Sequence, residues 1–338
     1  MKAFVIEEPG VSAIAEVNDV SPADDEVLLH TRVVGFCGTD LSTFRGKNPL
    51  VSYPRIPGHE IAATIAAVGR GVPAYLTPGL NVAVSPYNPC GSCAACFRGR
   101  ANSCMRNQTL GVQRDGAMRE RFTAHWSKVF VAEGLSLRDL SFVEPLAVGF
   151  HSASRGRVHS SDTVAVIGCG TVGLGAIASA ARSGAKVIAI DLDDRKLELA
   201  KQAGAAHSVH SGKEDLHESL QSLTGGHGPD VIIEAVGTPG TFRAAVDEVA
   251  YTGRVVYIGW AKEPITYETK LFILKELDIL GSRNSLDEFP QVIEMLQRRE
   301  FPVEATVSAT VPLSKAGEAL KAWSDAPQAF SKILVEMA

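Results

Sequence analysis

The fold is decided by Thr163–Ala181, which reads TVAVIGCGTVGLGAIASAA. A short apolar run, TVAVI, is typical of a buried strand, and the Ala/Gly pattern that follows it is typical of a helix. The turn between them, Gly168–Gly173, has the form G-x-G-x-x-G. The stretch is long enough to span a membrane, but its four glycines and its change of period favour a strand, a turn and a helix.

This glycine turn predicts a dinucleotide site. The first glycine permits a tight turn, the second lets backbone approach a pyrophosphate, and the third packs helix against strand. Asp191 ends the next apolar strand, eighteen residues after Gly173. A carboxylate there accepts hydrogen bonds from ribose hydroxyls and repels a 2′-phosphate, which favours NAD over NADP, although Arg195 and Lys196 weaken the preference. The expected cofactor contacts are Gly168, Gly170, Thr171, Val172, Gly173, Asp191, Val236, Gly259 and Asn284.

Apolar strands alternate with helical patterns between residues 149 and 284, which predicts an α/β fold with a doubly wound parallel sheet. The expected strands are Thr163–Gly168, Lys186–Asp191, His207–His210, Asp230–Gly237, Arg254–Trp260 and Leu277–Arg283.

The sequence on either side of this region has a different texture. Residues 1–148 carry short alternating runs such as Glu26–Val34 and Glu60–Val68, with many Pro and Gly, and so predict a β-rich domain with long loops. The tail, 285–338, is mixed, with a helix expected near Leu286–Arg299 and a strand near Lys332–Glu336.

The composition is that of a globular chain of two domains, with 338 residues, 45% of them hydrophobic and 21% charged. A formal net charge of −5 and the lack of a basic block argue against nucleic acid or an anionic membrane as partner. The N-terminus has no signal-peptide pattern, which favours the cytoplasm. In that reducing compartment, clustered cysteines bind metal rather than form disulfides.

Four cysteines lie within fifteen residues, spaced Cys-x2-Cys-x2-Cys-x7-Cys. Four thiolates close a tetrahedral shell around one zinc ion and leave no position for substrate, so we expect a structural zinc at Cys90, Cys93, Cys96 and Cys104. The alternative interpretation of the four cysteines is an iron–sulfur cluster. Bacterial ferredoxins have three residues in the last gap and then proline after the last cysteine, whereas here the gap is seven and Met105 follows.

A second group comprises Cys37 in GFCGTD, His59 in PRIPGHE and Glu144 in FVEPLAVGFH. This mixture of S, N and O ligands suits a catalytic zinc that keeps one exchangeable position. Glu60, next to His59, would ligate directly or exchange with water. Taken singly, these residues have plain structural explanations, namely a buried cysteine, a hydrogen-bonded histidine and a helix start. The prediction therefore depends on their coincidence.

Together these motifs resemble those of the zinc-containing medium-chain dehydrogenase/reductase superfamily over nearly the full chain. GFCGTD, GHE, the four cysteines, EPLAVGFH, GCGTVG and Asp191 occur in the family's order. The resemblance implies a GroES-like catalytic domain of residues 1–148 and 285–338 and a Rossmann NAD-binding domain of residues 149–284. It also implies two zinc ions per chain, hydride transfer from an alcohol to NAD, and a homo-dimer or homo-tetramer.

Within the superfamily, the chain resembles polyol, threonine and sugar-acid dehydrogenases, which carry glutamates like Glu60 and Glu144 near the zinc. FRGKNP, SYPRIPGHE and LGSRN are similar to bacterial sugar-acid 5-oxidoreductases of the L-galactonate, L-gulonate or L-idonate type. A sugar acid needs a cation for its carboxylate, and Arg45, Lys47 and Arg283 are candidates. Sorbitol-like polyols, L-threonine and vicinal diols stay open as substrates.

The resemblance makes Thr39, two residues after Cys37, the expected first proton acceptor. Many relatives have a histidine where this chain has Ser42, which puts the farther proton relay in doubt, although a hydroxyl can pass a proton. Ala63 and Leu80–Asn81 also depart from the family pattern, at positions that look structural. A catalytically silent protein on the same fold is the alternative from another class, and retention of the expected metal ligands argues against it.

Overall fold

The computed structural model describes residues 1–337, which divide into two compact units. The first unit comprises residues 1–144, 289–298 and 303–337, and the second comprises residues 145–288 and 299–302. One helix, α4 (Val143–Arg155), starts in the first unit and continues into the second. No helix within the described residues is long and apolar enough to cross a membrane.

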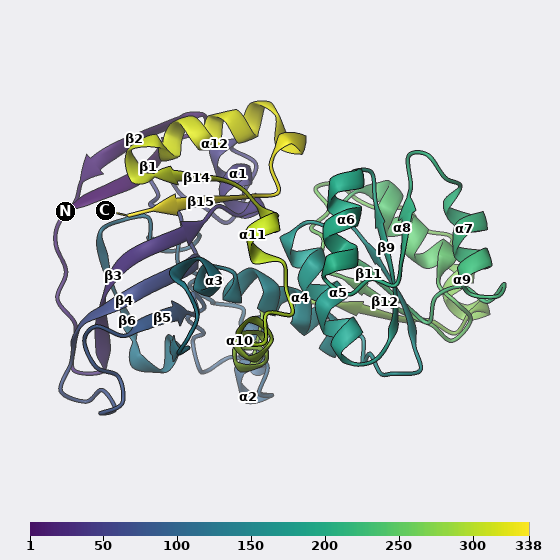
Figure 1. Ribbon diagram of the computed structural model, residues 1–338, viewed down its shortest axis with the longest axis horizontal. Coiled ribbons are helices and arrows are strands. Elements are labelled where there is room, and N and C mark those ends of the chain that lie inside the picture. Colours follow the sequence, from purple (N-terminus) through teal and green to yellow (C-terminus); the bar gives the residue numbers. More distant parts are fainter. Residues whose placement is uncertain (338) are drawn as a thin grey trace. The chain divides into compact units, whose positions relative to one another are not determined.

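The second unit is built on a six-stranded parallel sheet in the order β10-β9-β8-β11-β12-β13. Strands β9, β11 and β12 of this sheet are labelled in Figure 1. Its strands are β8 (Thr163–Ile167), β9 (Lys186–Asp191), β10 (His207–His210), β11 (Val231–Glu234), β12 (Arg254–Tyr257) and β13 (Asp278–Gly281). The doubly wound sheet expected from the sequence is confirmed, strand by strand. Strand order reverses between β8 and β11, and open α/β sheets bind their ligands at the carboxyl ends beside such a reversal.

Burial explains why these strands read as continuous apolar runs. All four residues of β11 are buried, as are the last four of β8, because helices cover a parallel sheet of this kind. The connecting helices are α5 (Thr171–Arg182), α6 (Asp194–Gln202), α7 (Leu216–Leu223), α8 (Pro239–Glu248) and α9 (Lys270–Leu274). The two edge strands are the exceptions, since three of the four residues of β13 are exposed and only Val209 of β10 is buried.

The first unit contains a seven-stranded sheet and a separate hairpin. The hairpin pairs β1 (Lys2–Glu8) with β2 (Val11–Glu16). The sheet runs β14-β15-β3-β4-β5-β7, with β6 paired to β3. Its strands are β3 (Glu26–Gly35), β4 (Glu60–Val68), β5 (Asn81–Val84), β6 (Arg121–His125), β7 (Val129–Val131), β14 (Val307–Pro312) and β15 (Lys332–Glu336). The C-terminal strand β15 lies antiparallel to β3 and thereby reaches the segment that carries Cys37.

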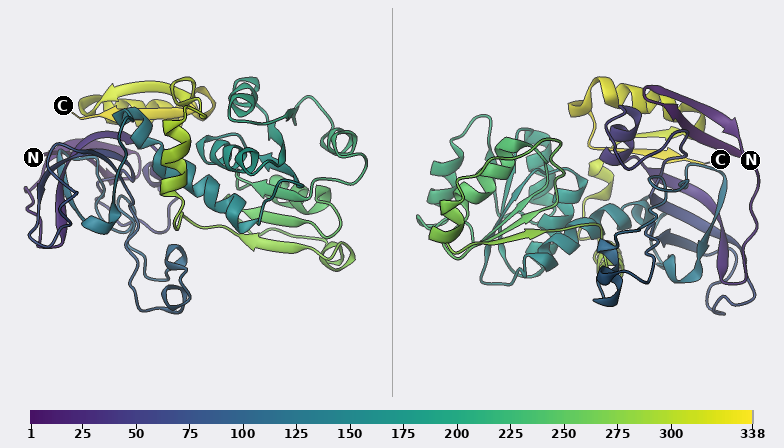
Figure 2. Two further views of the ribbon diagram at one scale, coloured as in Figure 1. Left: turned by 60° about the horizontal axis from the view of Figure 1, so that its bottom comes forward. Right: turned by 180° about the vertical axis from the view of Figure 1, so that it is seen from behind.

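Short helices complete the first unit. They are α1 (Gly38–Phe44), α2 (Ala94–Phe97), α3 (Leu137–Ser141), α10 (Phe289–Gln297), α11 (Val303–Thr306) and α12 (Ala316–Asp325). The segment Cys90–Cys104, here called the cysteine lobe, includes α2 and extends away from the sheet of this unit (Figure 2). None of the residues of α2 is buried, so the lobe lacks an apolar core of its own.

Candidate active site

The cysteine lobe brings its four thiols together. Their ligand atoms all lie within 4.8 Å of one another. The Sγ–Sγ distances are 3.5 Å for Cys90–Cys104, 3.5 Å for Cys93–Cys96 and 3.8 Å for Cys93–Cys104. A zinc ion with Zn–S bonds of about 2.3 Å has tetrahedral S–S edges of roughly 3.8 Å, so the four sulfurs fit one zinc ion.

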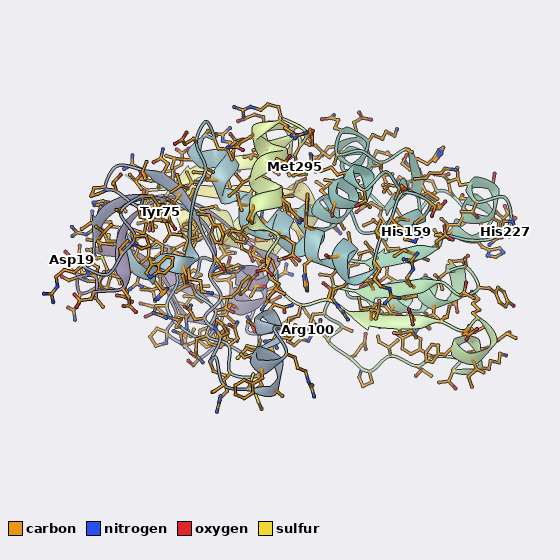
Figure 3. The ribbon with its side chains drawn as sticks, turned by 90° about the horizontal axis from the view of Figure 1, so that it is seen from below. Asp19, Tyr75, Arg100, His159, His227 and Met295 are labelled. Carbon is orange, nitrogen blue, oxygen red and sulfur yellow. The ribbon has the colours of Figure 1, made fainter. Side chains whose placement is uncertain are left out.

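The surroundings of the lobe favour a thiolate at Cys90 and Cys93, whereas burial raises the pKa of Cys96 to about 11. The backbone amides of Cys90 and Arg106 donate to the Sγ of Cys104, at 3.2 and 3.3 Å. A hydrogen bond from the backbone of Ser92, followed by one from the Arg106 guanidinium, lowers the pKa of Cys90 to about 5. Such bonds stabilise and orient ligands around a metal. Arg100, labelled in Figure 3, adds positive charge to the same lobe.

Cys37 and His59 meet at the start of α1. Cys37 precedes the helix, and its thiol interacts with the imidazole of His59 through a side-chain hydrogen bond. Asp40 fixes this helix start, because its Oδ2 accepts from the backbone amide of Cys37 at 2.9 Å. Its Oδ1 lies 3.8 Å from the Nδ1 of His59. A carboxylate on the Nδ1 side orients the ring and leaves Nε2 for a metal.

The charges around His59 favour a cation. Burial lowers the pKa of His59, but the negative charges of Asp40 and Cys37 outweigh it, so the pKa lies well above its usual value. Asp40 Oδ1 and His59 Nδ1 are buried and have no hydrogen-bond partner within residues 1–337. Buried anionic groups with unpaired atoms are costly unless a cation accompanies them. This donor set therefore fits a divalent metal.

Glu144, at the start of α4, lies close enough to raise the pKa of His59. Its Oε1 accepts a short hydrogen bond from the hydroxyl of Tyr87, and both side chains are buried. Burial raises the pKa of Glu144 to about 7, although the charge of His59 opposes the rise. Because Tyr87 occupies Oε1, the second carboxylate oxygen is the atom that would ligate a metal.

Glu60 has a different partner. Both of its carboxylate oxygens accept from the Nζ of Lys332, at 2.8 and 2.6 Å, and Lys332 also donates to the carbonyl of Phe36. Burial raises the pKa of Glu60, and Lys332 opposes the rise. Within residues 1–337, only the cysteine lobe gathers three or more possible ligand atoms within 4.8 Å of one another, so neither Glu60 nor Glu144 completes a three-ligand group of that compactness with Cys37 and His59.

Replacing Lys332 with methionine should destabilise the protein by about 3–5 kcal/mol, because Glu60 would remain buried without its partner. Urea-induced unfolding of the variant and the parent chain measures this. The double variant Lys332→Met/Glu60→Gln should regain most of the loss, since no uncompensated buried charge remains. A single variant within about 1 kcal/mol of the parent would show that the pair contributes little.

The glycine turn of the second unit has the geometry expected of a dinucleotide site. Gly168 has a φ of +95°, a conformation that glycine adopts without strain. A Cβ on Gly173 would lie 1.8 Å from the carbonyl oxygen of Gly168, so helix and strand pack too closely for a side chain. A Cβ on Gly170 would meet no heavy atom of the chain within 4 Å, which leaves room for a pyrophosphate. Thr171 and Val172 open α5.

Asp191 ties the end of β9 to this turn. Its Oδ2 accepts from the backbone amide of Cys169 at 2.7 Å, and its Oδ1 accepts from the amides of Leu192 and Asp193. These three hydrogen bonds from backbone amides hold the carboxylate of Asp191 in a fixed place beside the glycine turn. Cys169 itself is buried, and burial raises the pKa of its thiol, which fits a packing role.

The other expected cofactor contacts follow later strands of the same sheet. Val236 comes after β11 and is exposed, Gly259 comes after β12, and Asn284 follows β13 with a φ of +55°. The first two lie at the carboxyl ends of their strands, near the reversal in strand order.

The proposed substrate cations differ in their surroundings. Arg45 is occupied, because its guanidinium donates to the hydroxyl of Ser324 at 3.0 Å and to the carbonyl of the same residue. This contact joins the end of α1 to α12 and weakens the case for Arg45 as a carboxylate ligand. Lys47 and Arg283 are exposed, and Thr39 is half-buried in the first turn of α1.

Sequence analysis did not single out Asp40, Tyr87 or Lys332. Asp40 stands three residues after Cys37, which is the spacing of a capping box. This spacing in the sequence could have identified Asp40 as the residue that fixes the start of α1. Tyr87 and Lys332 lie 57 and 272 residues along the chain from the glutamates they contact, and no local pattern marks such pairs.

The six-stranded parallel sheet and the seven-stranded sheet together define the fold of an alcohol dehydrogenase, with a Rossmann unit and a GroES-like unit. Family models agree: "Alcohol dehydrogenase GroES-like domain" matches residues 23–134, and "Zinc-binding dehydrogenase" matches residues 171–298. The chain belongs to the zinc-containing medium-chain dehydrogenase/reductase family, within its polyol and sugar-acid dehydrogenases.

Three relatives illustrate this placement. A sorbitol dehydrogenase of Bacillus subtilis is 36% identical, covering 80% of this chain and 79% of its own. The L-galactonate-5-dehydrogenase of Escherichia coli is 30% identical, covering 88% of this chain and 87% of its own. An alcohol dehydrogenase from Escherichia coli CFT073, solved in complex with NADH, is 30% identical and superposes with a TM-score of 0.91 over 99% of both chains.

Proposed function

We propose that this chain oxidises a secondary alcohol of a sugar acid of the L-gulonate, L-galactonate or L-idonate type, at the 5-position, and transfers the hydride to NAD. The observation that carries the proposal is the group formed by the partly buried Cys37 with the buried Asp40, His59 and Glu144, in which Asp40 Oδ1 and His59 Nδ1 have no hydrogen-bond partner within residues 1–337. Relatedness to the L-galactonate-5-dehydrogenase supports the substrate class.

When bound, zinc would act as a Lewis acid on the substrate hydroxyl, and NAD would accept the hydride. Cys37, His59 and Glu144 would hold that metal, with Asp40 orienting His59 and Tyr87 holding one oxygen of Glu144. Glu60 is the alternative ligand. Because Lys332 occupies both of its carboxylate oxygens, Glu60 could ligate a metal only if this pair opened.

Thr39 would accept the proton released from the substrate hydroxyl. It is half-buried and lies in the first turn of the helix that Cys37 precedes, two residues from that expected ligand. Ser42 lies in the same helix and is half-buried as well, and it is the next hydroxyl along the chain. We propose that the proton passes from Thr39 by way of the nicotinamide ribose.

Replacing Asp191 with serine should raise the ratio of NADP to NAD efficiency by roughly tenfold or more, because it removes a fixed negative charge from the place of the 2′-phosphate. Values of kcat/KM with each cofactor measure the ratio. Asp193→Ser is the matched control, since Asp193 caps α6 two residues away and serine can still cap. An unchanged ratio in Asp191→Ser would remove Asp191 from cofactor selection.

A substrate panel tests the proposed substrate. NAD reduction would be followed with aldonic acids, five- and six-carbon polyols, L-threonine and vicinal diols. We expect the highest kcat/KM with an aldonic acid, with its carboxylate bound by Lys47 or Arg283. The sorbitol dehydrogenase relative makes a sorbitol-like polyol the second candidate, and a preference for the neutral polyol would decide in its favour.

We also propose a cytoplasmic homo-dimer or homo-tetramer that binds neither nucleic acid nor membrane. All six cysteines are free thiols, as a reducing compartment requires. The edge strand β13 leaves Ile279 exposed, and Ile273 and Leu274 of the neighbouring α9 are also exposed. An open, apolar strand edge is a common site of pairing between copies, and sedimentation equilibrium measures the assembly.

A further inference from the structure

Glu234 is a buried carboxylate that the proposed reaction does not use. It is the last residue of β11, fully buried at 0% exposed, beside the reversal in strand order. Its neighbours along the chain, Val236 and Gly237, begin the loop that leads to α8. Burial of an unpaired carboxylate is unfavourable, so the contacts of Glu234 must compensate for its removal from water.

One carboxylate oxygen organises the loop after β11. Glu234 Oε1 accepts from the backbone amides of Val236 at 2.9 Å and Gly237 at 2.7 Å, and from the hydroxyl of Thr241 at 2.7 Å. Thr241 in turn pairs with Thr238, the residue that caps α8. A single acceptor therefore sets the backbone from β11 to the first turn of α8.

The other side of Glu234 organises the loop after β12. Its backbone carbonyl accepts from the amides of Ile258 and Gly259, at 2.9 and 3.1 Å. A Cβ on Gly259 would lie 2.4 Å from the Oε2 of Glu234 and 2.4 Å from the amide nitrogen of Gly237. The loops after β11 and β12 thus pack backbone against backbone, with the carboxylate of Glu234 between them.

The loop after β11 also borders the glycine turn. A Cβ on Gly168 would lie 2.6 Å from the Cγ2 of Val236. Val236 thus lies against the first glycine of the turn, while about half of its surface is exposed to solvent. Any displacement of Val236 would change the edge of the site where the dinucleotide is expected to bind.

We propose that Glu234 is a positioning residue for the dinucleotide cofactor: its carboxylate holds the loops at Val236 and Gly259 in the arrangement that receives it. Glu234 acts as a hydrogen-bond acceptor whose side-chain length places the acceptor oxygen at the amides of the loop. Its negative charge contributes less to this role than the position of that oxygen. The inference rests on the proposed cofactor and is independent of zinc, since Glu234 touches none of the expected metal ligands.

Two variants of Glu234 separate the effect of its side-chain length from the effect of its charge. Glu234→Asp keeps the charge but withdraws the carboxylate by about 1.5 Å. Glu234→Gln keeps the reach and one acceptor oxygen. We expect Glu234→Asp to raise the Kd for NADH by roughly tenfold or more, because buried amides lose their acceptor, and Glu234→Gln to raise it by no more than about threefold. Glu198→Asp, the same change at an exposed position on α6, should leave it unaltered.

Energy transfer from tryptophan to NADH measures this Kd, and Trp260, directly after Gly259, is 66% exposed. The KM for NAD should rise in Glu234→Asp with the zinc content unchanged. Hydrogen exchange should increase at residues 235–241 and 258–260 and stay unaltered in β9. A general loss of packing would raise exchange throughout the second unit and would overturn the inference.

If Glu234→Asp does not fold, Thr241→Val decides the matter, with Thr241→Ser as its control. Removing the one side-chain donor should raise the Kd for NADH about threefold, and serine should restore it. Equal NADH affinity in Thr241→Val and the parent chain would overturn the inference. Tight NADH binding by the parent without alcohol oxidation would contradict the proposed function alone, whereas failure of the parent to bind NADH would overturn both.

Discussion

Replacing Cys37 with serine should abolish alcohol oxidation, lowering kcat/KM by roughly a thousandfold or more, while the protein remains folded. Cys37 is the one thiol of the first unit outside the cysteine lobe, and it precedes α1 in a partly buried position. Serine can keep the backbone bond to Asp40, which the amide of residue 37 makes. It cannot supply a thiolate, so a catalytic metal would lose its softest ligand.

Metal content separates this explanation from misfolding. The parent chain should bind two zinc ions, whereas Cys37→Ser should bind one and keep its unfolding temperature within a few degrees. Cys169→Ser is the matched control, because it changes a buried thiol in the second unit and should leave two zinc ions in place. A Cys37→Ser variant that turns over substrate and holds two zinc ions would falsify the proposed catalytic site.

The parallel sheet was predictable because local sequence carries its signal. Its central strands β8 and β11 are short apolar runs closed by turns, and strands that are buried on both faces need little information from elsewhere. The glycine turn was predictable for the same reason, because Gly168 and Gly173 are close in sequence and pack against each other. The four cysteines also lie close in sequence, so their spacing alone indicates a common ligand.

The contacts that complete the candidate site were not predictable in the same way. Lys332 reaches Glu60 only because β15 pairs with β3, and a single lysine near a chain end has no pattern that marks it as buried. The same long-range packing joins Arg45 to Ser324 and removes it from the leading substrate candidates. Local periodicity specifies elements, whereas pairings such as these depend on how the elements assemble.

Assembly also explains why the two groups of metal-binding residues differ. The lobe gathers its ligands over fifteen residues without help from the sheet. Cys37, His59 and Glu144 come from the end of β3, the start of β4 and the start of α4, so the packed sheet must bring them together. We therefore expect loss of the lobe ligands to affect stability first, and loss of Cys37 to affect activity first.

Replacing Cys93 with alanine should open the cysteine lobe, remove one zinc ion and lower the unfolding temperature. Cys93 is buried, and its Sγ lies 3.5 and 3.8 Å from those of Cys96 and Cys104. No residue of α2 is buried, so little besides the metal can hold this segment. Structural zinc contributes about 10–16 kcal/mol in small zinc-finger peptides, and three remaining thiols would retain only part of that.

Calorimetry and zinc analysis measure the loss of stability and the loss of one zinc ion. Ala94→Ser is the matched control, because it alters the adjacent exposed residue and should leave both unchanged. A Cys93→Ala protein with parental stability and two zinc ions would refute the structural zinc, and the lobe would then need another source of order.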